Sequence, residues 1–356
     1  MIRVLQIGLT SNYGGIENVV HGWLPYIRED IVFDCINYGT EPLAYEEDYR
    51  KAGGRIYRIE PRHNHPFRHY MQLKRIISSG EHAVIHCHVM TLSEPEPIML
   101  ANRYGARIII HGHSTNGSLT LKRKMIQAVA WCIAGKRDYT GYACSHDAGS
   151  IIFRGRSFKI IENGIDLDQF RYSNDEREVV RKELGLEPDD DVIGHVGRAS
   201  PEKNYPFLLQ TFREVKKKNT HAKLLLVGNV DKNAVVQNMI DSYGIRDGVI
   251  CTGEVYDTKC YYQAMDLFFL PSIYEGVSVS LIEAQAMGLP CVASSSISKE
   301  SVISHQFRFV DPDINQAVSA IIEQMRDPVR RDHVTIDERY HVKNSAKKVM
   351  DGYLVQ

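Results

Sequence analysis

The sequence of 356 residues lacks the features of a membrane-spanning or disulfide-stabilised protein. No uninterrupted apolar run approaches the roughly 18 residues that a membrane span needs, and the short apolar run at 4–9 has no signal-peptide flanks. The seven cysteines are scattered and include no CxxC pair, which argues against a zinc ribbon or disulfide framework and favours a reducing, cytoplasmic environment. With 43 basic and 44 acidic residues, the chain shows no excess positive charge that would indicate nucleic acid as a partner.

Short runs rich in β-branched residues alternate with helix-length segments along the chain. The first series of expected strands is 4–9, 31–37, 55–59, 83–88, 107–113, 141–145 and 159–163. The second series is 192–197, 223–228, 249–253, 267–271, 290–294 and 307–310. The clearest helical stripe has the spacing of one helix face and comprises Ile16, Val19, Val20, Trp23, Leu24 and Ile27. The pattern predicts an α/β protein with two doubly wound parallel sheets, divided near the charged region 165–190.

In such sheets ligands bind beyond the carboxyl ends of the strands, so the residues that follow the strands are the informative ones. The first segment, 8–17, contains Gly14 and Gly15 before the helical stripe. These glycines allow close backbone approach to a ligand, and a helix N-terminus favours an anion; a plain tight turn is the alternative. The segment is neither GxGxxG nor a Walker A loop, and the second strand does not end in an acid, which disfavours a nicotinamide enzyme.

The second segment, 197–204, places two cations at a predicted helix start. Ser200 and Pro201 are typical of an N-cap and the first helical position. Arg198 lies just before that start and Lys203 lies in the first helical turn, where cations oppose the helix dipole unless an anion binds. We therefore expect an anion site here; two solvated surface charges are the alternative.

The third segment, 271–284, carries two carboxylates. Glu275 lies in a glycine-containing loop and Glu283 in the following helix, so both could accept hydrogen bonds from sugar hydroxyls. The N–H groups around Ser278 and Val279 could face a phosphate. The alternatives are a solvated loop acid for Glu275 and a capping box, Ser280-x-x-Glu283, for the second carboxylate.

Two HxH pairs end strands of the first series, and they comprise His86, His88, His111 and His113. Residues i and i+2 of a strand point to the same face, but no third ligand type stands nearby in sequence. We expect histidines that line a polar cleft; hydrogen-bonded core histidines and a zinc site are the alternatives.

In this order and spacing, the motifs resemble those of the GT-B-fold, family 4 retaining glycosyltransferases over nearly the whole chain. The segments that carry the resemblance are Gly14-Gly15-Ile16-Glu17, His113, Glu162-Asn163-Gly164-Ile165-Asp166 with Phe170, Gly197-Arg198 with Lys203, Val227-Gly228, Gly253-Glu254-Val255, and Pro271-Ser272 leading to Glu275-(x7)-Glu283. The resemblance implies two Rossmann-like domains facing across a cleft. It places an acceptor-binding domain at 1–168, a nucleotide-sugar-binding domain at 169–339, and a final helix within 340–356 that packs back on the first domain.

The resemblance also implies the residue roles. Arg198 and Lys203 correspond to the cations that hold the donor diphosphate, helped by backbone at Gly14, Gly15, Ser278 and Val279. Glu283 corresponds to the ribose ligand, Glu275 to the ligand of the donor-sugar hydroxyls, His113 to the contact near the sugar 6-position, and Val255 to the backbone contact with the base. One departure is Asn204, because family members often have Gly after the lysine.

The implied activity is metal-independent, cofactor-free transfer of a hexose or N-acetylhexosamine from a nucleotide-sugar, UDP being the family's commonest nucleotide. Transfer retains the anomeric configuration, and the acceptor is a glycan or polyprenyl-diphosphate-linked saccharide of bacterial exopolysaccharide or capsule synthesis. The alternatives are a GT-B-fold nucleotide-sugar 2-epimerase, which lacks this Glu-x7-Glu segment, and a non-catalytic nucleotide-sugar-binding subunit.

The acceptor side is expected to lie in a basic, aromatic stretch at 62–75. Its cations are Arg62, Arg68, Lys74 and Arg75. Each basic group near anionic lipid contributes about 1 kcal/mol, so the chain is expected to be a cytoplasmic protein that binds peripherally to the inner face of the plasma membrane. A merely solvated basic loop is the alternative.

Overall fold

The computed structural model describes residues 1–113, 121–326, 331 and 336–354. The chain forms two compact units. The first unit contains Met1–Gly164 and Arg339–Gln356, and the second contains Ile165–Glu338. The sequence analysis placed the corresponding divisions at residues 168 and 340.

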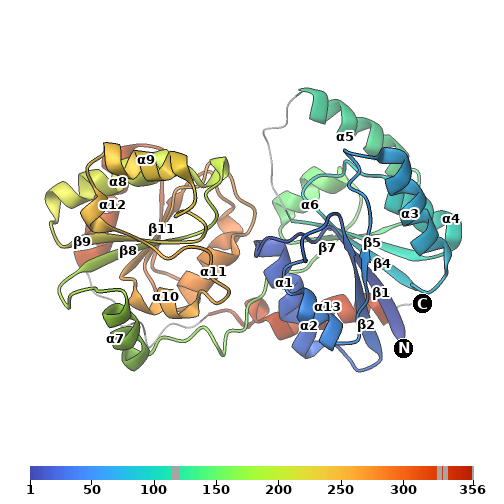
Figure 1. Ribbon diagram of the computed structural model, residues 1–356, viewed down its shortest axis with the longest axis horizontal. Coiled ribbons are helices and arrows are strands. Elements are labelled where there is room, and N and C mark those ends of the chain that lie inside the picture. Colours follow the sequence, from blue (N-terminus) through green and yellow to red (C-terminus); the bar gives the residue numbers. More distant parts are fainter. Residues whose placement is uncertain (114–120, 327–330, 332–335, 355–356) are drawn as a thin grey trace. The chain divides into compact units, whose positions relative to one another are not determined.

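The first unit is built on a seven-stranded, entirely parallel sheet in the order β3-β2-β1-β4-β5-β6-β7 (Figure 1). Its strands are β1 (Ile2–Ile7), β2 (Ile31–Asn37), β3 (Ile56–Arg58), β4 (Val84–Val89), β5 (Arg107–Gly112), β6 (Thr140–Ala143) and β7 (Lys159–Ile160). Its helices are α1 (Gly15–Trp23), α2 (Glu46–Lys51), α3 (Pro66–Ser78), α4 (Glu96–Tyr104), α5 (Leu121–Ala134), α6 (His146–Phe153) and α13 (Val342–Leu354).

Helix α1 shows how the sequence sets the element. Val19, Val20 and Trp23 of the expected stripe are buried. The α-helix ends at Trp23, earlier than the stripe predicts, and a 3-10 turn follows over Leu24–Tyr26. Pro25 explains the early end, because proline has no N–H to continue the helical hydrogen bonds.

The second unit has a six-stranded parallel sheet in the order β10-β9-β8-β11-β12-β13. Its strands are β8 (Asp191–Val196), β9 (Ala222–Val227), β10 (Val249–Cys251), β11 (Leu267–Leu270), β12 (Cys291–Ser294) and β13 (Phe307–Val310). Its α-helices are α7 (Asn174–Glu183), α8 (Tyr205–Lys218), α9 (Ala234–Ser242), α10 (Lys259–Ala264), α11 (Val279–Ala286) and α12 (Ile314–Arg326). The short 3-10 turn η2 spans Pro201–Lys203.

Each sheet therefore has the doubly wound topology that the sequence predicted, and each has its own apolar core. The strand order reverses between β1 and β4 in the first unit and between β8 and β11 in the second. Ligands of such sheets bind beyond the carboxyl ends of the strands at these reversal points. None of the helices in the described part of the chain combines the length and hydropathy that crossing a lipid bilayer requires.

Candidate functional site

The candidate donor site of the second unit begins where β8 ends against β9. Gly197 and Arg198 follow β8, and Gly228 follows β9. Gly228 has a φ of +136°, and a Cβ atom there would lie 2.4 Å from the carbonyl oxygen of Gly197. Glycine is therefore required for the two chain segments to pass this closely, which fixes the position of the loop that carries Arg198.

The structure brings Lys203 and Glu275 together across the reversal point. Lys203 lies in η2 after β8, and Glu275 lies in the loop after β11. The Lys203 Nζ atom is 2.5 Å from Glu275 Oε1, and Ser272 Oγ is 3.2 Å from the same oxygen. The two side chains are only 15% and 16% exposed, so solvent screens their attraction weakly. Arg198 is exposed and has no ion-pair partner among the residues described.

The expected helix start at Ser200 is wrong in one respect. Ser200 precedes only the 3-10 turn η2, and its hydroxyl group caps nothing; α8 begins at Tyr205. Lys203 thus ends the short turn and does not lie in the first turn of an α-helix. Asn204 has left-handed backbone angles, φ 55° and ψ 48°, and its Nδ2 donates to the carbonyl oxygen of Pro271 at 3.2 Å. Asparagine tolerates this conformation, so it can occupy a position where family members often have glycine.

Glu283 is a buried carboxylate and not part of a capping box. Ser278 is the N-cap of α11, so Ser280 lies inside the helix and the expected Ser280-x-x-Glu283 alternative is wrong. Tyr262 of α10 donates its hydroxyl hydrogen to Glu283 Oε2 at 2.7 Å. Burial raises the pKa of Glu283 to about 7, although the Tyr262 hydrogen bond opposes that rise. Val279 begins α11, and the first-turn N–H groups of a helix have no intrahelical acceptor.

Two further side chains of this site were missed by the sequence analysis. Tyr262 holds Glu283, and no motif in the sequence points to it. His195 lies within β8, where its Nδ1–H donates to the carbonyl oxygen of Phe269 at 3.0 Å. Its Nε2 atom is buried and has no hydrogen-bond partner among the described residues. Burial, and secondarily the charge of Lys203, lowers the pKa of His195 to about 3. The sequence did offer one signal for this residue, because a histidine is unusual among the apolar residues 192–196 of a buried strand.

Val255 lies in the loop between β10 and α10. Its side chain is half-buried and packs against the apolar cluster on one side of the second sheet. The residue before it, Glu254, is exposed. The side chain thus anchors the loop that the sequence analysis expected to contact a base through its backbone.

In the first unit, the carboxylate of Glu17 holds the loop between β1 and α1 by accepting hydrogen bonds. The backbone N–H and the hydroxyl of Thr10 donate to Glu17 Oε1 at 2.9 and 2.8 Å. A Cβ atom at Gly14 would lie 2.6 Å from Glu17 Oε2, so the glycine makes room for this carboxylate. Gly15 is the first residue of α1. The loop is thus held by its own contacts, with the start of α1 at its end.

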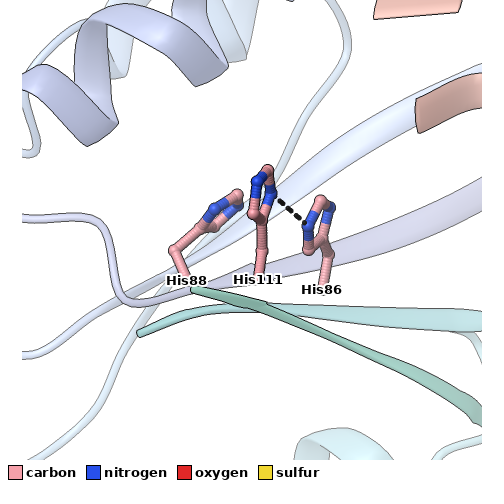
Figure 2. Close-up of side chains that lie close together, drawn as sticks. All are labelled: His86, His88 and His111. Atoms are coloured by element: carbon pink, nitrogen blue, oxygen red, sulfur yellow. Dashed lines mark hydrogen bonds between the residues drawn. The ribbon is translucent and has the colours of Figure 1, made fainter. Parts of the chain in front are cut away.

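The two histidines of β4, His111 of β5 and His113, which directly follows β5, form a buried cluster instead of lining an open cleft. Figure 2 shows three of them, His86, His88 and His111. His86 and His111 are fully buried, and His88 and His113 are 5% and 8% exposed. Their rings pack under Trp23 of α1, which stacks on His86 and His111 with centroids 6.0 and 6.1 Å away. The sequence left open histidines that line a polar cleft, hydrogen-bonded core histidines and a zinc site, and the burial of the rings fits core histidines. Ligand atoms of His86, His88 and His111 lie within 4.8 Å of one another, which is close enough for the three rings to share one metal ion.

The basic stretch at 62–75 is smaller than the sequence suggested. Arg62 pairs with Glu96 at 2.9 Å and donates to the carbonyl oxygen of Ser93 at 3.1 Å. Arg68 and Arg75 are exposed on α3, and Lys74 is half-buried. Arg68, Lys74 and Arg75 have no ion-pair partner among the residues that the structure describes, so these three cations can face an external partner.

Comparison with known proteins shows what this chain is similar to. Residues 176–348 match the family model described as glycosyl transferases group 1. The EpsF protein of Bacillus subtilis (strain 168) is 27% identical over 318 residues, which cover 84% of this chain and 80% of that protein. An Escherichia coli protein named UDP-Gal:alpha-D-GlcNAc-diphosphoundecaprenol alpha-1,3-galactosyltransferase is 23% identical over 296 residues, which cover 80% of this chain and 74% of that protein.

A solved structure matches both units. HepE of Anabaena, crystallised in complex with UDP and glucose, superposes with a TM-score of 0.81 at 17% sequence identity, and the match covers 99% of each chain. At that identity the match supports the GT-B fold, as the two doubly wound sheets already do. The fold implied by the resemblance is confirmed: the chain has the GT-B fold, and its residues 176–348 match the family model for glycosyl transferases group 1.

Proposed function

We propose that this chain is a retaining, metal-independent glycosyltransferase that moves a hexose or N-acetylhexosamine from a UDP-sugar to a lipid-linked saccharide or glycan acceptor in exopolysaccharide or capsule synthesis. The observation that carries the proposal is the grouping of Lys203, Glu275 and the exposed Arg198 at the reversal point of the second sheet. The UDP bound by Anabaena HepE supports the choice of nucleotide.

The two cations serve the departing diphosphate. As the bond to the sugar breaks, negative charge gathers on the leaving phosphate, and fixed cations and helix N–H groups stabilise it without reorganising. Arg198 contributes a guanidinium fork and Lys203 a compact charge. The backbone N–H groups of Ser278 and Val279, at the start of α11, are the proposed further donors to the diphosphate. The leaving phosphate can take the acceptor's proton on the same face of the sugar, so retention needs no protein nucleophile.

The two carboxylates serve hydroxyl groups. Glu283 is held in place by Tyr262 and, when ionised, accepts hydrogen bonds from the ribose diol. Glu275 accepts from the sugar hydroxyls once Lys203 turns to the phosphate. In the first unit, Gly14, Gly15 and His113 are the proposed donor contacts, and backbone near Val255 is the proposed contact with the base.

The acceptor is proposed to reach the enzyme from a membrane. The named acceptor of the Escherichia coli relative is a diphosphoundecaprenol-linked sugar, which supports a lipid-linked acceptor here. On α3, Phe67 and Met71 are 75% and 44% exposed beside Arg68 and Arg75. Exposed apolar side chains among cations are typical of a helix that lies on an anionic lipid surface. Peripheral attachment to the inner face of the plasma membrane follows from this proposal.

Titration calorimetry with free UDP, GDP and ADP tests the donor site. We expect UDP to bind, and Arg198→Ala to lower the transfer rate about 10- to 150-fold, because charge-assisted hydrogen bonds contribute about 1.5–3 kcal/mol. Arg213→Ala, which removes another exposed guanidinium of the second unit, is the matched control and should change neither binding nor rate. Failure of all three nucleotides to bind, or near wild-type turnover of Arg198→Ala, would contradict the proposal. A donor epimer formed without acceptor would indicate the epimerase alternative.

A further inference from the structure

The histidine cluster of the first unit is a continuous hydrogen-bonded chain. Figure 2 shows the hydrogen bond between His86 and His111; Tyr353 of α13 and Gln6 of β1, which are not drawn, connect His86 to His88. Of the eight ring nitrogens of His86, His88, His111 and His113, six have hydrogen-bond partners. Because these nitrogens already donate or accept, the arrangement fits hydrogen-bonded neutral rings better than a metal site.

Burial keeps the rings neutral. It lowers the pKa of His86 and of His113 to about 3, and holds the pKa of His88 and of His111 well below the ordinary value. A neutral imidazole carries one N–H donor and one bare acceptor nitrogen. Within a chain of neutral rings, fixing one proton therefore fixes all the others.

The amide of Gln6 fixes the first proton. Its Oε1 atom can only accept, so His88 Nε2, 2.9 Å away, carries the hydrogen. His88 Nδ1 is then bare and accepts from His113 Nε2–H at 3.0 Å. His113 is left with a bare Nδ1, and that atom has no hydrogen bond to any residue in the described ranges.

The amide of Gln6 also sets the direction of the hydrogen bonds that run through Tyr353 and His86 to His111. Gln6 Nε2 donates to the Tyr353 hydroxyl at 3.3 Å, and the single hydroxyl hydrogen goes to His86 Nδ1 at 2.6 Å. His86 Nε2 therefore carries the hydrogen and donates to His111 Nδ1 at 3.2 Å. All donors point one way, from His113 to His111, and such aligned chains strengthen one another. Turning the amide of Gln6 over would reverse every bond and place a hydrogen on His113 Nδ1.

We propose that Gln6, His88 and Tyr353 are positioning residues for His113: they hold it as the Nε2–H tautomer, so that its bare Nδ1 accepts a hydrogen bond from a hydroxyl group of the donor sugar. This inference rests on the proposed function, because it assigns His113 a contact with the sugar. It gives α13, the helix that closes the first unit, a role in setting the hydrogen-bonding character of a residue at the end of β5.

Histidine-selective ¹⁵N NMR of the whole chain reads the tautomers directly. In the wild type we expect His88 and His113 each as a single Nε2–H form. Gln6→Met removes both amide contacts, so the two ¹⁵N shifts of His113 should move toward each other as both tautomers become populated. Tyr353→Phe removes the hydroxyl that donates to His86 Nδ1, so both tautomers of His86 and of His111 should become populated. Tyr142→Phe is the matched control: its buried hydroxyl has no partner within the described part of the chain, although its ring contacts the same histidines.

Steady-state kinetics then distinguish a role of Gln6 in positioning His113 from a purely structural role. Gln6→Met should lower kcat/KM for the UDP-sugar about threefold to tenfold, the effect of one weakened hydrogen bond, and leave unchanged the affinity for UDP, which lacks the transferred sugar. Tyr353→Phe gives a second reading if Gln6→Met does not fold. An Nδ1–H tautomer of His113 in the wild type, or unchanged shifts in both variants, overturns the inference. Failure of UDP to bind would instead refute the proposed function, because the NMR reading does not depend on a ligand.

Discussion

Lys203 and Glu275 neutralise each other when the site holds no donor. The ammonium and the carboxylate are in direct contact, and both are largely shielded from solvent. A donor that uses Lys203 for its diphosphate must therefore compete with Glu275. The ion pair lowers the affinity for the nucleotide, and it keeps two charges from being left unpaired in a weakly solvated place.

Glu275→Gln tests that competition. Removing the carboxylate charge should raise the affinity for UDP about fivefold, equivalent to roughly 1 kcal/mol of lost attraction to Lys203. The turnover of the UDP-sugar should fall, because the amide replaces an acceptor of sugar hydroxyls, while the melting temperature changes little. Calorimetry with UDP and a transfer assay measure the two effects. Glu202→Gln, in the neighbouring turn, is the control; a weaker affinity for UDP in Glu275→Gln would refute the competition.

The raised pKa of Glu283 predicts a pH dependence of donor binding. Because that pKa is about 7, the carboxylate form grows from pH 6 to pH 8. The ribose hydroxyls donate to the carboxylate, so the affinity for UDP should rise over this range. Tyr262→Phe removes the hydrogen bond that favours the charged form and should move the midpoint to higher pH.

Calorimetry of UDP binding at several pH values checks this prediction. The terminal phosphate of UDP titrates in the same range, so Glu283→Gln supplies the reference curve. A wild-type curve that coincides with that reference would show that the ionisation of Glu283 does not contribute to binding.

At the scale of the element, helix α3 exposes apolar and basic side chains together, which is typical of a surface that binds a membrane. Its exposed Phe67 and Met71 lie among Arg68, Lys74 and Arg75. We expect the chain to co-sediment with vesicles of anionic phosphatidylglycerol and to be released by salt. Replacing both Phe67 and Met71 by serine should weaken binding at least tenfold, since burying a large apolar side chain contributes about 1.5–3 kcal/mol.

The chain offers a matched control for this test. Val179 and Val235 of the second unit are 59% and 69% exposed, and serine at both should leave vesicle binding unchanged. Equal binding to neutral phosphatidylcholine vesicles, or none to either kind, would show that α3 does not dock on an anionic membrane.

Local sequence predicted the elements well, and its errors have local causes. Apolar strands followed by helix-length segments were enough to predict both sheets, because parallel strands are buried on both faces. The early end of α1 came from Pro25, and the short turn before α8 came from Asn204 in a left-handed conformation. Both residues are local signals in the sequence, and each ends or delays a helix that the apolar spacing alone predicts.

The sequence could predict only those site residues that directly follow the carboxyl ends of strands. Arg198, Lys203 and Glu275 could be proposed from their order along the chain, since neighbouring parallel strands end at one edge of the sheet. Tyr262 and Tyr353 could not, because their contacts with Glu283 and His86 depend on how helices pack. For the histidines, the strand period shows that they share a face, but their burial depends on Trp23 and on a helix more than 200 residues further along the chain.

At the scale of the whole molecule, the two units differ in their response to acid. In the described part of the first unit, four buried histidines and the half-buried His21 have lowered pKa values, and one carboxyl, Glu94, has a raised pKa. Within the residues described for the second unit, one histidine, His195, has a lowered pKa and one carboxyl, Glu283, has a raised pKa. A histidine that stays neutral when folded but takes up a proton when unfolded makes the folded state less stable as the pH falls below about 6.5. A carboxyl with a raised pKa has the opposite effect.

The first unit should therefore unfold at a higher pH than the second. Four such histidines reduce its free energy of unfolding by about 5 kcal/mol per pH unit below pH 6.5, which exhausts a typical stability near pH 4–5. In the second unit, His195 and Glu283 nearly offset each other down to about pH 4.5. Both tryptophans of the chain, Trp23 and Trp131, lie in the first unit. Tryptophan fluorescence should thus change at a higher pH than the second half of the far-UV circular dichroism signal; coincident transitions would show that the buried histidines do not set the acid limit of the first unit.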